Sequence, residues 1–546
     1  MTCSKIFSGD LPELTYDILK YLHDDFSTLY SCVLVNRLWC RLAIPLLWEN
    51  PFSITTGNRN FIEIYLCNLD EDIKTRLNEY KINDNSLFSN TLFNYPRFLK
   101  YLNTCEIFYS VTKWFNNTFN TSKRGNRGFL RDSDTCSVSN FRKIIYTSLF
   151  KIFNENEINL HTFEIDVSNS DYNDYYTYYD NIFELILQNT NFIRNTRYLN
   201  LYIDDSSEKY DEDDADRDRY KLFKDRILQI IDLHQNLKKL LLDYGNLPLY
   251  QSLLLSKDSN FSNTLNTIIL FCIDSKDMVN LAKTFEQLNV LESIHIIYCF
   301  LNCDFIQQII NLTKPFKLKS LCMRKIPNIE FLSLLLQKSG NYLENFEFNF
   351  RDTNSSLLLK QQLVELIIEY CKNIKLLDLF ILENQVTIYL IFKLIENFKQ
   401  SLEYLSIYLQ DRNTKSESST IILQNLGHFL PPKLEYLNLN LYFVNTNDFE
   451  IFLKNSQDTF IKKLLICNIR GQNILPSIKE YIMKKKMVKY LAAYITISSY
   501  GNYGNKYICS DLTSSVNEVN EFRLYNIKVR EYYRLLITSY DFIKEI

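Results

Sequence analysis

The sequence is poor in the residues that interrupt regular structure, since its 546 residues include only 10 glycines and 10 prolines. Flexible linkers are rich in glycine, serine or proline, so this scarcity argues against small domains on long tethers. Long apolar runs are also lacking: Ile388–Phe392, for example, is followed by a lysine. A membrane-spanning helix needs about 20 apolar residues. We therefore expect no membrane partner.

Charge of one sign is lacking too, because 61 Lys and Arg nearly balance 64 Asp and Glu, for a net charge of −3. Surfaces that bind nucleic acid carry a strong positive field, so we expect no nucleic-acid partner. The 13 cysteines include no CxxC pair, and no secretory leader precedes the first predicted helix. These features predict reduced cysteines in an intracellular protein, in the cytoplasm or the nucleus.

Catalytic and cofactor motifs are also missing. The five histidines form no HExxH pair, GxSxG is absent, and Gly501–Lys506 lacks the spacing and the Ser or Thr of a phosphate-binding loop. His295, Cys299 and Cys303 are spaced by four residues, but His295 lies in a predicted strand, where helical spacing does not apply. We therefore expect a protein that is not an enzyme and that uses no cofactor or metal.

What the sequence has instead is repetition. A single core stops growing at roughly 250–300 residues, so a chain of this length needs several domains or a repeat array. A template L-x-x-L-x-L, with conservative replacements, recurs at intervals of roughly 25–32 residues. The clear copies are Leu237/Leu240/Leu242, Leu265/Ile268/Leu270, Leu291/Ile294/Ile296, Leu318/Leu321/Met323, Leu343/Phe346/Phe348, Ile374/Leu377/Leu379, Leu402/Leu405/Ile407, Leu434/Leu437/Leu439 and Ile461/Leu464/Ile466. Weaker copies are Leu160/Phe163/Ile165, Leu199/Leu201, Val488/Leu491 and Val519/Phe522/Leu524.

The alternating end of the template predicts a strand with one apolar face. Helical spacing between copies predicts helices at Asp277–Leu288, Phe305–Thr313, Ile329–Lys338, Leu358–Cys371, Val386–Phe398 and Ile474–Lys485. One strand and one helix cannot bury their apolar faces alone, whereas stacked repeats can. We therefore predict an α/β fold in which residues 158–546 form a curved solenoid, with a parallel concave sheet and outer helices. A non-repeat α/β protein with several leucine-rich strands is the alternative.

This region resembles leucine-rich repeats, with one departure from their pattern. An Asn or Cys is expected three residues after the last leucine of each copy, where it satisfies backbone groups at the turn. Cys299 fits, but Ile273, Ile326, Arg351 and Leu382 do not. We therefore expect irregular turns and repeats of uneven length.

The N-terminal stretch Asp10–Pro51 reads DLPELTYDILKYLHDDFSTLYSCVLVNRLWCRLAIPLLWENP, which predicts a compact set of short amphipathic helices. It opens with Leu11-Pro12 and contains two of the chain's three tryptophans, Trp39 and Trp48. Residues 8–51 resemble an F-box, the module that joins a substrate receptor to a cullin–RING ubiquitin ligase through a Skp-type adaptor. Residues 35–48, VNRLWCRLAIPLLW, are most like the corresponding segment of the large fungal F-box families. Helical periodicity alone would also suit any three-helix bundle.

The resemblance implies that the module binds the Skp-type adaptor and that the remaining chain selects a protein target. The residues at family contact positions are Leu11, Pro12, Ile18, Leu22, Leu29, Cys32, Val35 and Trp39. The chain would then be the substrate-recognition subunit of the ligase. An F-box scaffold without ubiquitin transfer is a second hypothesis, and an enzyme hidden in the irregular region Phe52–Asn159 is a third.

The repeat template also predicts which side chains contact the target, because residues between the leucines point to the concave surface. These are Tyr198, Asn200, Tyr202, Phe271, His295, Arg324, Phe380, Tyr404, Tyr408, Tyr436, Asn438 and Asn440. Tyr and Arg often dominate binding energy, so we expect part of the target footprint within Tyr404–Asn440. Alternatively, these aromatic side chains merely cover the sheet.

Residues 52–157 carry the weakest pattern, which we interpret as a helical bridge and degenerate first repeats. Within them we expect a helix at Phe98–Leu102. Tyr172–Asp180 and Asp204–Arg219 are polar, acidic insertions that we expect to be solvated loops, with a docking loop for a basic partner as the alternative.

Overall fold

The computed structural model describes residues 11–22, 25–53, 61–67, 69, 75, 91–120, 135–156, 158–167, 175–188, 191–202, 214–243, 260–275, 281–350, 356–382, 385–410, 417–441, 443–468, 471–485, 488–499 and 506–545. The chain divides into two compact units. The first comprises Met1–Asn266 and Gln287–Val290, and the second comprises Thr267–Glu286 and Leu291–Ile546. Both units are mixed α/β, which confirms the α/β part of the predicted fold class. Among the described helices, none combines the length and the hydropathy needed to cross a membrane.

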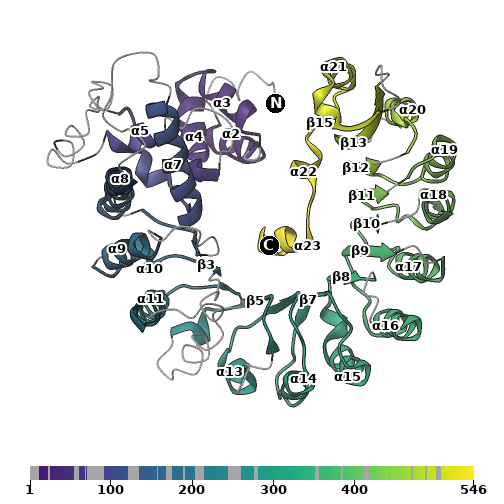
Figure 1. Ribbon diagram of the computed structural model, residues 1–546, viewed down its shortest axis with the longest axis horizontal. Helices are drawn as coiled ribbons and strands as arrows, with labels where there is room; N and C mark the ends of the chain where they lie inside the picture. The colour runs from purple at the N-terminus through teal and green to yellow at the C-terminus, as the bar shows by residue number, and fades with distance from the viewer. Residues whose placement is uncertain are drawn as a thin grey trace. The chain divides into compact units, whose positions relative to one another are not determined.

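The described part of the first unit begins with three short helices: α2 (Pro12–Lys20), α3 (Phe26–Val33) and α4 (Arg37–Leu47) (Figure 1). The Asp25 carboxylate caps α3 by accepting a hydrogen bond from the Thr28 N–H at 3.2 Å. Asn36 caps α4 in the same way through the Trp39 N–H at 3.0 Å. Leu29 and Trp39 are buried where the helices pack together. The amphipathic pattern therefore predicted these helices correctly.

The rest of the first unit alternates helices with four parallel strands in the order β1-β2-β3-β4. Its elements are η1 (Pro51–Ser53), α5 (Phe61–Leu66), η3 (Tyr95–Phe98), β1 (Tyr101–Asn103), α7 (Thr104–Asn120), α8 (Thr135–Glu155), β2 (Thr162–Asp166), α9 (Tyr175–Gln188), α10 (Asn191–Arg194), β3 (Tyr198–Tyr202), α11 (Asp214–Asp232), β4 (Lys239–Leu242) and η7 (Asn260–Asn263).

Two predictions in this unit are wrong. The helix expected at Phe98–Leu102 is replaced by the end of η3 and the start of β1. The backbone N–H groups of Lys100 and Tyr101 donate to the carbonyl oxygen of Glu49 at 3.0 and 3.1 Å, which holds this stretch at the sheet edge. The described parts of the two acidic insertions are helical, because they form the beginnings of α9 and α11. The remainder of both insertions lies outside the described residues.

The second unit repeats a strand followed by a helix. Its strands run in the order β5 to β14, parallel up to β13, while β14 is antiparallel to β13 and β15 is parallel to β13. The strands are β5 (Thr267–Phe271), β6 (Ser293–Ile297), β7 (Leu318–Met323), β8 (Asn345–Asn349), β9 (Leu376–Leu382), β10 (Tyr404–Gln410), β11 (Tyr436–Leu441), β12 (Lys463–Asn468), β13 (Tyr490–Ser499), β14 (Lys506–Asp511) and β15 (Lys528–Val529).

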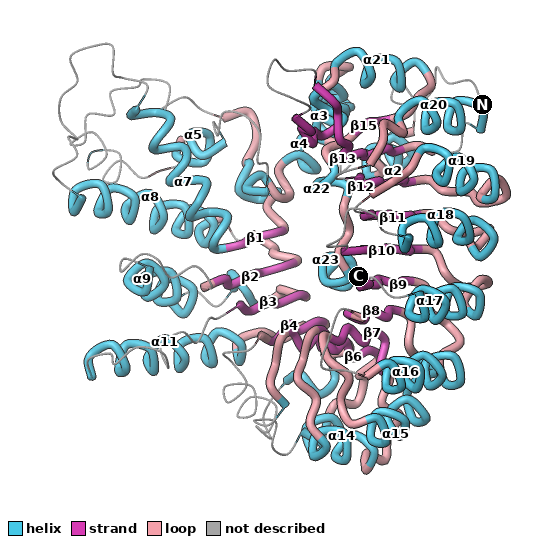
Figure 2. Tube along the Cα trace, turned by 45° about the vertical axis from the view of Figure 1, so that its right-hand side comes forward, coloured by secondary structure: helices cyan, strands magenta, loops and turns pink. Residues whose placement is uncertain are grey.

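The connecting helices of this unit lie on one face of its sheet (Figure 2). They are α13 (Leu281–Gln287), α14 (Cys303–Ile310), α15 (Ile329–Ser339), α16 (Leu357–Tyr370), α17 (Gln385–Asn397), α18 (Glu417–Phe429), α19 (Thr446–Asn455) and α20 (Leu475–Lys485), with η9 (Gly340–Tyr342) after α15. Each strand and helix predicted from the clear copies of the template is present.

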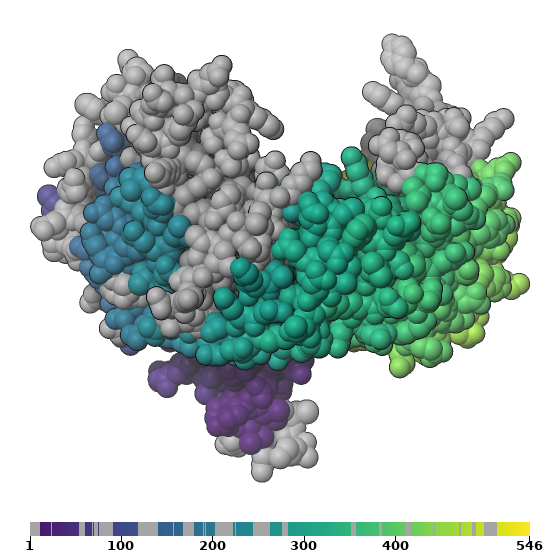
Figure 3. Space-filling model, turned by 90° about the horizontal axis from the view of Figure 1, so that it is seen from below, coloured from purple at the N-terminus to yellow at the C-terminus, as the bar shows by residue number. Residues whose placement is uncertain are grey.

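The core of the second unit consists of apolar columns that run across the strands. One column is formed by residues in direct register that are at most 1% exposed: Phe346, Leu377, Leu405, Leu437, Leu464 and Leu491. The helices pack over these columns and against each other, as in the stacked rings of Phe392 on α17 and Phe429 on α18, whose centroids are 5.0 Å apart. The side chains of α14 to α18 close over this side of the sheet (teal to green in Figure 3). Each repeat therefore covers apolar side chains of the repeats on either side of it.

A further polar contact joins neighbouring strands where they begin. The Glu344 carboxylate pairs with Lys319 and with Lys375, whose Nζ lies 2.9 Å from Oε2. Burial alone would raise the pKa of Glu344, but the hydrogen bonds from the two lysines lower it below its ordinary value. This carboxylate is therefore held in its charged form.

The predicted repeat copy Val519/Phe522/Leu524 is wrong. After η10 (Leu512–Ser514), these residues form the helix α21 (Val516–Leu524). Val519 and Phe522 are three residues apart, a spacing that suits one face of a helix as well as the template. Only Phe522 is buried, and Leu524 is 82% exposed. The apolar spacing alone therefore does not distinguish a repeat strand from a helix at these residues.

The turn after β12 contains an asparagine that satisfies backbone groups, although not at the position expected from the repeat template. At the end of β12, the side-chain oxygen of Asn468 accepts hydrogen bonds from the N–H groups of Val444 (3.2 Å) and Gly471 (2.8 Å). Its amide donates to the Gln472 carbonyl oxygen at 2.9 Å. Asn468 lies two residues after Ile466 rather than three, so the expected spacing missed it.

We predict that Gly471→Ala destabilises the second unit. A Cβ at this position would collide with the Asn468 side chain and the Val444 backbone. Overpacking of this kind typically costs about 1–3 kcal/mol of unfolding free energy, to be measured by urea denaturation. Gln457→Ala, at an exposed turn, is the control and should change stability by less than about 0.5 kcal/mol. Equal stabilities of the two variants would contradict this account of the turn.

Candidate binding surfaces

The helices α2–α4 expose an unusual number of large apolar side chains. Tyr21 is 91% exposed and Leu34 is 75% exposed. The rings of Phe26 and Tyr30 stack on the surface of α3 with centroids 6.4 Å apart. The full set is Leu14, Ile18, Tyr21, Phe26, Tyr30, Leu34 and Val35, which we call the N-terminal apolar surface. Large exposed apolar areas mark sites where another protein or a membrane binds.

The structure separates the predicted adaptor contacts into two groups. Ile18 and Val35 belong to the N-terminal apolar surface, and Leu11, Pro12 and Leu22 are half-buried. The three remaining residues are buried within the module, where they stabilise its helices: Leu29, Cys32 and Trp39. Sequence reasoning missed Leu14, Tyr21, Phe26, Tyr30 and Leu34 as surface residues. Their signal is that they are apolar yet lie off the periodic stripe that α2–α4 bury.

Aromatic contacts attach this module to the rest of the first unit. The Trp48 ring lies with its centroid 4.2 Å from that of Tyr95 and 5.2 Å from that of Tyr65. The next residue, Glu49, forms an ion pair with Lys100 beside β1. These contacts therefore hold α2–α4 against the first strands of the unit.

The second candidate surface is the inner face of the second unit, which we define as the face of its sheet opposite the connecting helices. The C-terminal segment, residues 530–545, lies against this face (yellow in Figure 1). It contains two short helices, α22 (Tyr532–Leu535) and α23 (Ser539–Glu545). The chain thus covers part of its own sheet.

The first half of the C-terminal segment is anchored by Tyr532. Its hydroxyl donates to the Asn438 side-chain oxygen at 2.7 Å, and its N–H donates to Asp511 at 2.7 Å. The Tyr532 ring is 1% exposed and packs in a cluster with Tyr436 and Leu465. Tyr532 therefore belongs to the core of the unit.

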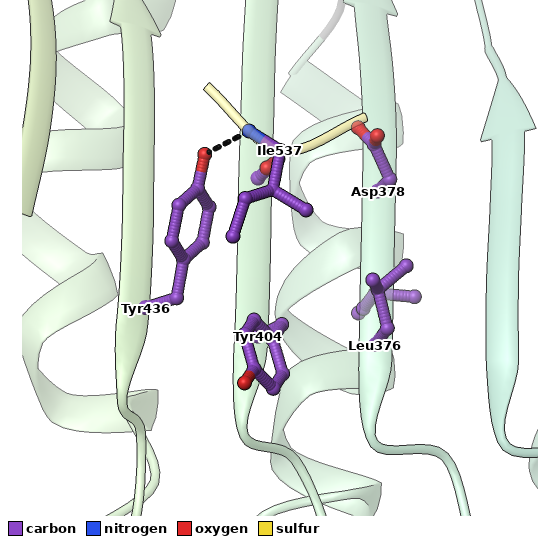
Figure 4. A pocket seen from close by; sticks show the side chains of 7 residues that line it. Leu376, Asp378, Tyr404, Tyr436 and Ile537 are labelled. Carbon is purple, nitrogen blue, oxygen red and sulfur yellow. Dashed lines mark hydrogen bonds between the residues drawn. The ribbon is translucent and has the colours of Figure 1, made fainter. Parts of the chain in front are cut away.

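The second half of the segment comprises residues 537–545, and we call it the latch. The Ile537 N–H donates to the Tyr436 hydroxyl at 3.1 Å, a contact visible in Figure 4. The Phe542 ring packs on Tyr404, with centroids 4.8 Å apart. Ile537 lines a pocket that is too narrow to hold a water molecule, and the sheet residues that line it are Leu376, Leu377, Asp378, Tyr404, Ser406 and Tyr436.

Two buried carboxyl groups lie beneath the latch. Glu347 on β8 and Asp378 on β9 are partners in register, with exposed fractions of 4% and 3%. The Ser539 hydroxyl donates to Asp378 Oδ2 at 3.2 Å, and the Tyr298 hydroxyl donates to Glu347 at 2.8 Å. The other Asp378 oxygen, Oδ1, is buried and has no hydrogen-bond partner in the described part of the chain.

Burial raises the pKa of both acids. For Asp378 the nearby Glu347 carboxylate raises the pKa further, to well above its ordinary value, although hydrogen bonds from Ser539 oppose the shift. For Glu347, hydrogen bonds from Ser539 and Tyr298 and the charge of Arg324 limit the rise. Two carboxylates in direct register repel each other when both are charged, so the pair favours a state that holds a proton.

The structure brings several predicted target contacts together around this segment. Tyr404 and Phe271 touch the latch through Phe542 and Tyr540, the latter pair with ring centroids 4.3 Å apart. The remaining predicted residues of the second unit are buried (His295, Tyr436, Asn438), half-buried (Phe380, Tyr408, Asn440) or exposed (Arg324). Phe380 and Tyr408 stack with centroids 4.4 Å apart.

The predicted contacts of the first unit lie on β3, away from this cluster in sequence. Tyr198 is half-buried, while Asn200 and Tyr202 are buried. The Asn200 amide donates to the Glu164 carboxylate on β2 at 3.2 Å. Asn200 therefore has a partner within the sheet.

The spaced residues His295, Cys299 and Cys303 do not converge. His295 Nδ1 lies 2.7 Å from the Ser320 hydroxyl oxygen, and Cys299 donates to the Leu270 carbonyl oxygen at 3.4 Å. Over the described residues, no group of His, Cys, Asp and Glu side chains is arranged to hold a metal ion.

No protein-family model matches the sequence, and no curated protein matches it significantly.

We predict that the buried acid pair makes the protein less stable as the pH rises. A carboxyl group whose pKa is raised by folding contributes stability fully below its unfolded pKa and loses it as the pH rises through the folded pKa. Unfolding free energies from urea denaturation should therefore fall as the pH rises above about 4, the ordinary pKa of a carboxyl group. In Asp378→Asn this fall should be smaller.

Glu344→Gln is the control, because the pKa of Glu344 is lowered by folding. Its contribution is present above the unfolded pKa and is lost as the pH falls, so this variant should alter only the acidic limb. A fall of the native size in Asp378→Asn would show that the acid pair does not titrate in this range.

Proposed function

We propose that this chain is the substrate-recognition subunit of a Skp–cullin–F-box ubiquitin ligase. In this proposal, residues 8–51 are an F-box and the repeats form a leucine-rich-repeat-like solenoid. The observation that carries it is the N-terminal apolar surface on α2–α4, because short helices expose large side chains there while others of the same module form its core. Such a surface suits burial against a helical partner, as expected of the adaptor interface.

In this proposal the protein positions the target and does not itself catalyse ubiquitin transfer. The F-box holds the adaptor, the inner face of the repeats holds the target, and the ligase subunits bring the charged ubiquitin-conjugating enzyme near the target's lysines. Holding two reactants together raises their effective concentration and replaces a bimolecular step by an intramolecular one. The aromatic contacts of Trp48 support this role, because they hold the proposed F-box against the rest of the first unit.

We predict that Ile18→Glu with Val35→Glu weakens binding of the Skp-type adaptor at least about tenfold, or about 1.4 kcal/mol. Both side chains are exposed, so the charges leave the helices folded but place carboxylates in an apolar interface. Co-purification with the adaptor and titration calorimetry measure the effect. Leu358→Glu, at a residue 63% exposed on α16, is the matched control and should bind normally. Normal binding by the double variant would reject the F-box assignment.

A second prediction concerns the target. Tyr404→Ala with Tyr408→Ala should reduce target recovery in affinity purification about tenfold, since aromatic anchors often carry about 2 kcal/mol or more of binding energy. Adaptor binding should stay unchanged, because both residues lie on β10. Tyr436 is left intact, since it is buried under Ile537 and its loss would disturb the fold. Unchanged recovery of every adaptor-independent partner would place the target site elsewhere.

A further inference from the structure

We propose that the inner face around Glu347 and Asp378 is a groove for a peptide segment that carries a lysine or arginine beside aromatic side chains, and that the latch is its intramolecular competitor. This proposal rests on the proposed function only in taking that segment to belong to the ligase target. The groove itself consists of residues of the second unit alone.

The latch is bound in a way that allows it to leave without unfolding the unit. Ser539 and Ile543 are buried, but Thr538, Tyr540 and Phe542 are only half-buried and Asp541 is exposed. The anchor, by contrast, has a buried ring and hydrogen bonds at both its hydroxyl and its backbone N–H. Contacts that lie at the surface open at lower free energy than contacts in the core. Opening is therefore expected to begin after Leu536 and to spare Tyr532.

The latch also leaves the acid pair incompletely satisfied. Ser539 offers its hydroxyl and its backbone N–H to Asp378, and neither carries a charge. Asp378 Oδ1 stays buried without a partner in the described residues, and a buried polar atom without a hydrogen bond destabilises the folded state. Arg324, whose charge acts on Glu347, is exposed and lies over the Tyr298 ring at 4.7 Å.

A basic side chain would complete this site. An ammonium or guanidinium group donates several charge-assisted hydrogen bonds and removes the repulsion between the two carboxylates. The aromatic side chains around the acids suit such a ligand, because rings attract cations over their faces and pack against other rings. Phe271 and Tyr404 already receive rings from the latch. The latch thus supplies the aromatic side chains expected of the ligand but places no basic side chain beside the two acids.

The test uses fluorescent peptides of residues 537–546 and anisotropy with the full-length protein. The peptides carry the native sequence, Ser539→Lys, or phosphoserine at position 539. The proteins are the native chain and a chain with Tyr540→Ala and Phe542→Ala, which weakens the latch. A second variant, ending after Leu536, removes the latch but keeps the Tyr532 anchor. Circular dichroism and urea denaturation verify that each protein is folded, and adaptor binding is measured separately.

We expect the native peptide to bind the latch-weakened chain at least tenfold more tightly than the native chain. The Ser539→Lys peptide should bind at least tenfold more tightly than the native peptide. The phosphoserine peptide should not bind, because it adds about −1.5 to −2 charges beside two acids. Adding Tyr404→Ala to the latch-weakened chain should abolish binding, whereas adding Leu358→Ala, on the opposite side of the sheet, should not.

Absence of peptide binding to both folded latch variants would overturn the groove and leave the F-box proposal intact. Equal affinity of the native and Ser539→Lys peptides would overturn the preference for a basic residue. Loss of adaptor binding in all proteins together with normal peptide binding would instead contradict the proposed function and retain the groove.

Discussion

Burial of the apolar columns is the constraint on which the second unit depends. Each strand contributes one side chain per column, such as Leu377, Leu405 or Leu437, and a single strand has no means to cover it. Neighbouring strands and the helices on the outer face supply that cover, so each repeat is stable only within the stack. The same alternation sends the intervening residues to the inner face. The alternation of side chains along each strand therefore determines both the buried core and the candidate binding surface on the inner face.

The repeat strands were predictable because their signal is local. The spacing of three apolar residues located β2 to β13 without reference to distant contacts. The signal failed where tertiary contacts decide the structure. At Val519 and Phe522 the same spacing fits a helix, and at Lys100 and Tyr101 the Glu49 carbonyl holds the chain at the sheet edge. Asn468 was missed because its turn displaces the asparagine by one residue.

The candidate sites were predictable in part, for the same reason. Alternation placed Phe271, Tyr404 and Tyr436 on the inner face, but it held no information about what covers them. The latch contacts join residues 101 and 161 positions apart, and the C-terminal segment carries no repeat template. Glu347 and Asp378 occupy equivalent positions between template residues in consecutive repeats. Two acids at one repeat position were the available signal for their pairing.

Charge distinguishes the two candidate surfaces from each other. The N-terminal apolar surface exposes apolar side chains, so the proposed adaptor would bind it mainly through buried apolar area. The inner face instead holds two acids whose ionisation is suppressed by burial and by their proximity. A neutral latch can remain there because the pair can hold a proton, whereas a basic ligand would favour the charged form of both acids. Binding of such a ligand would therefore release protons, and its affinity over the neutral latch should rise with pH.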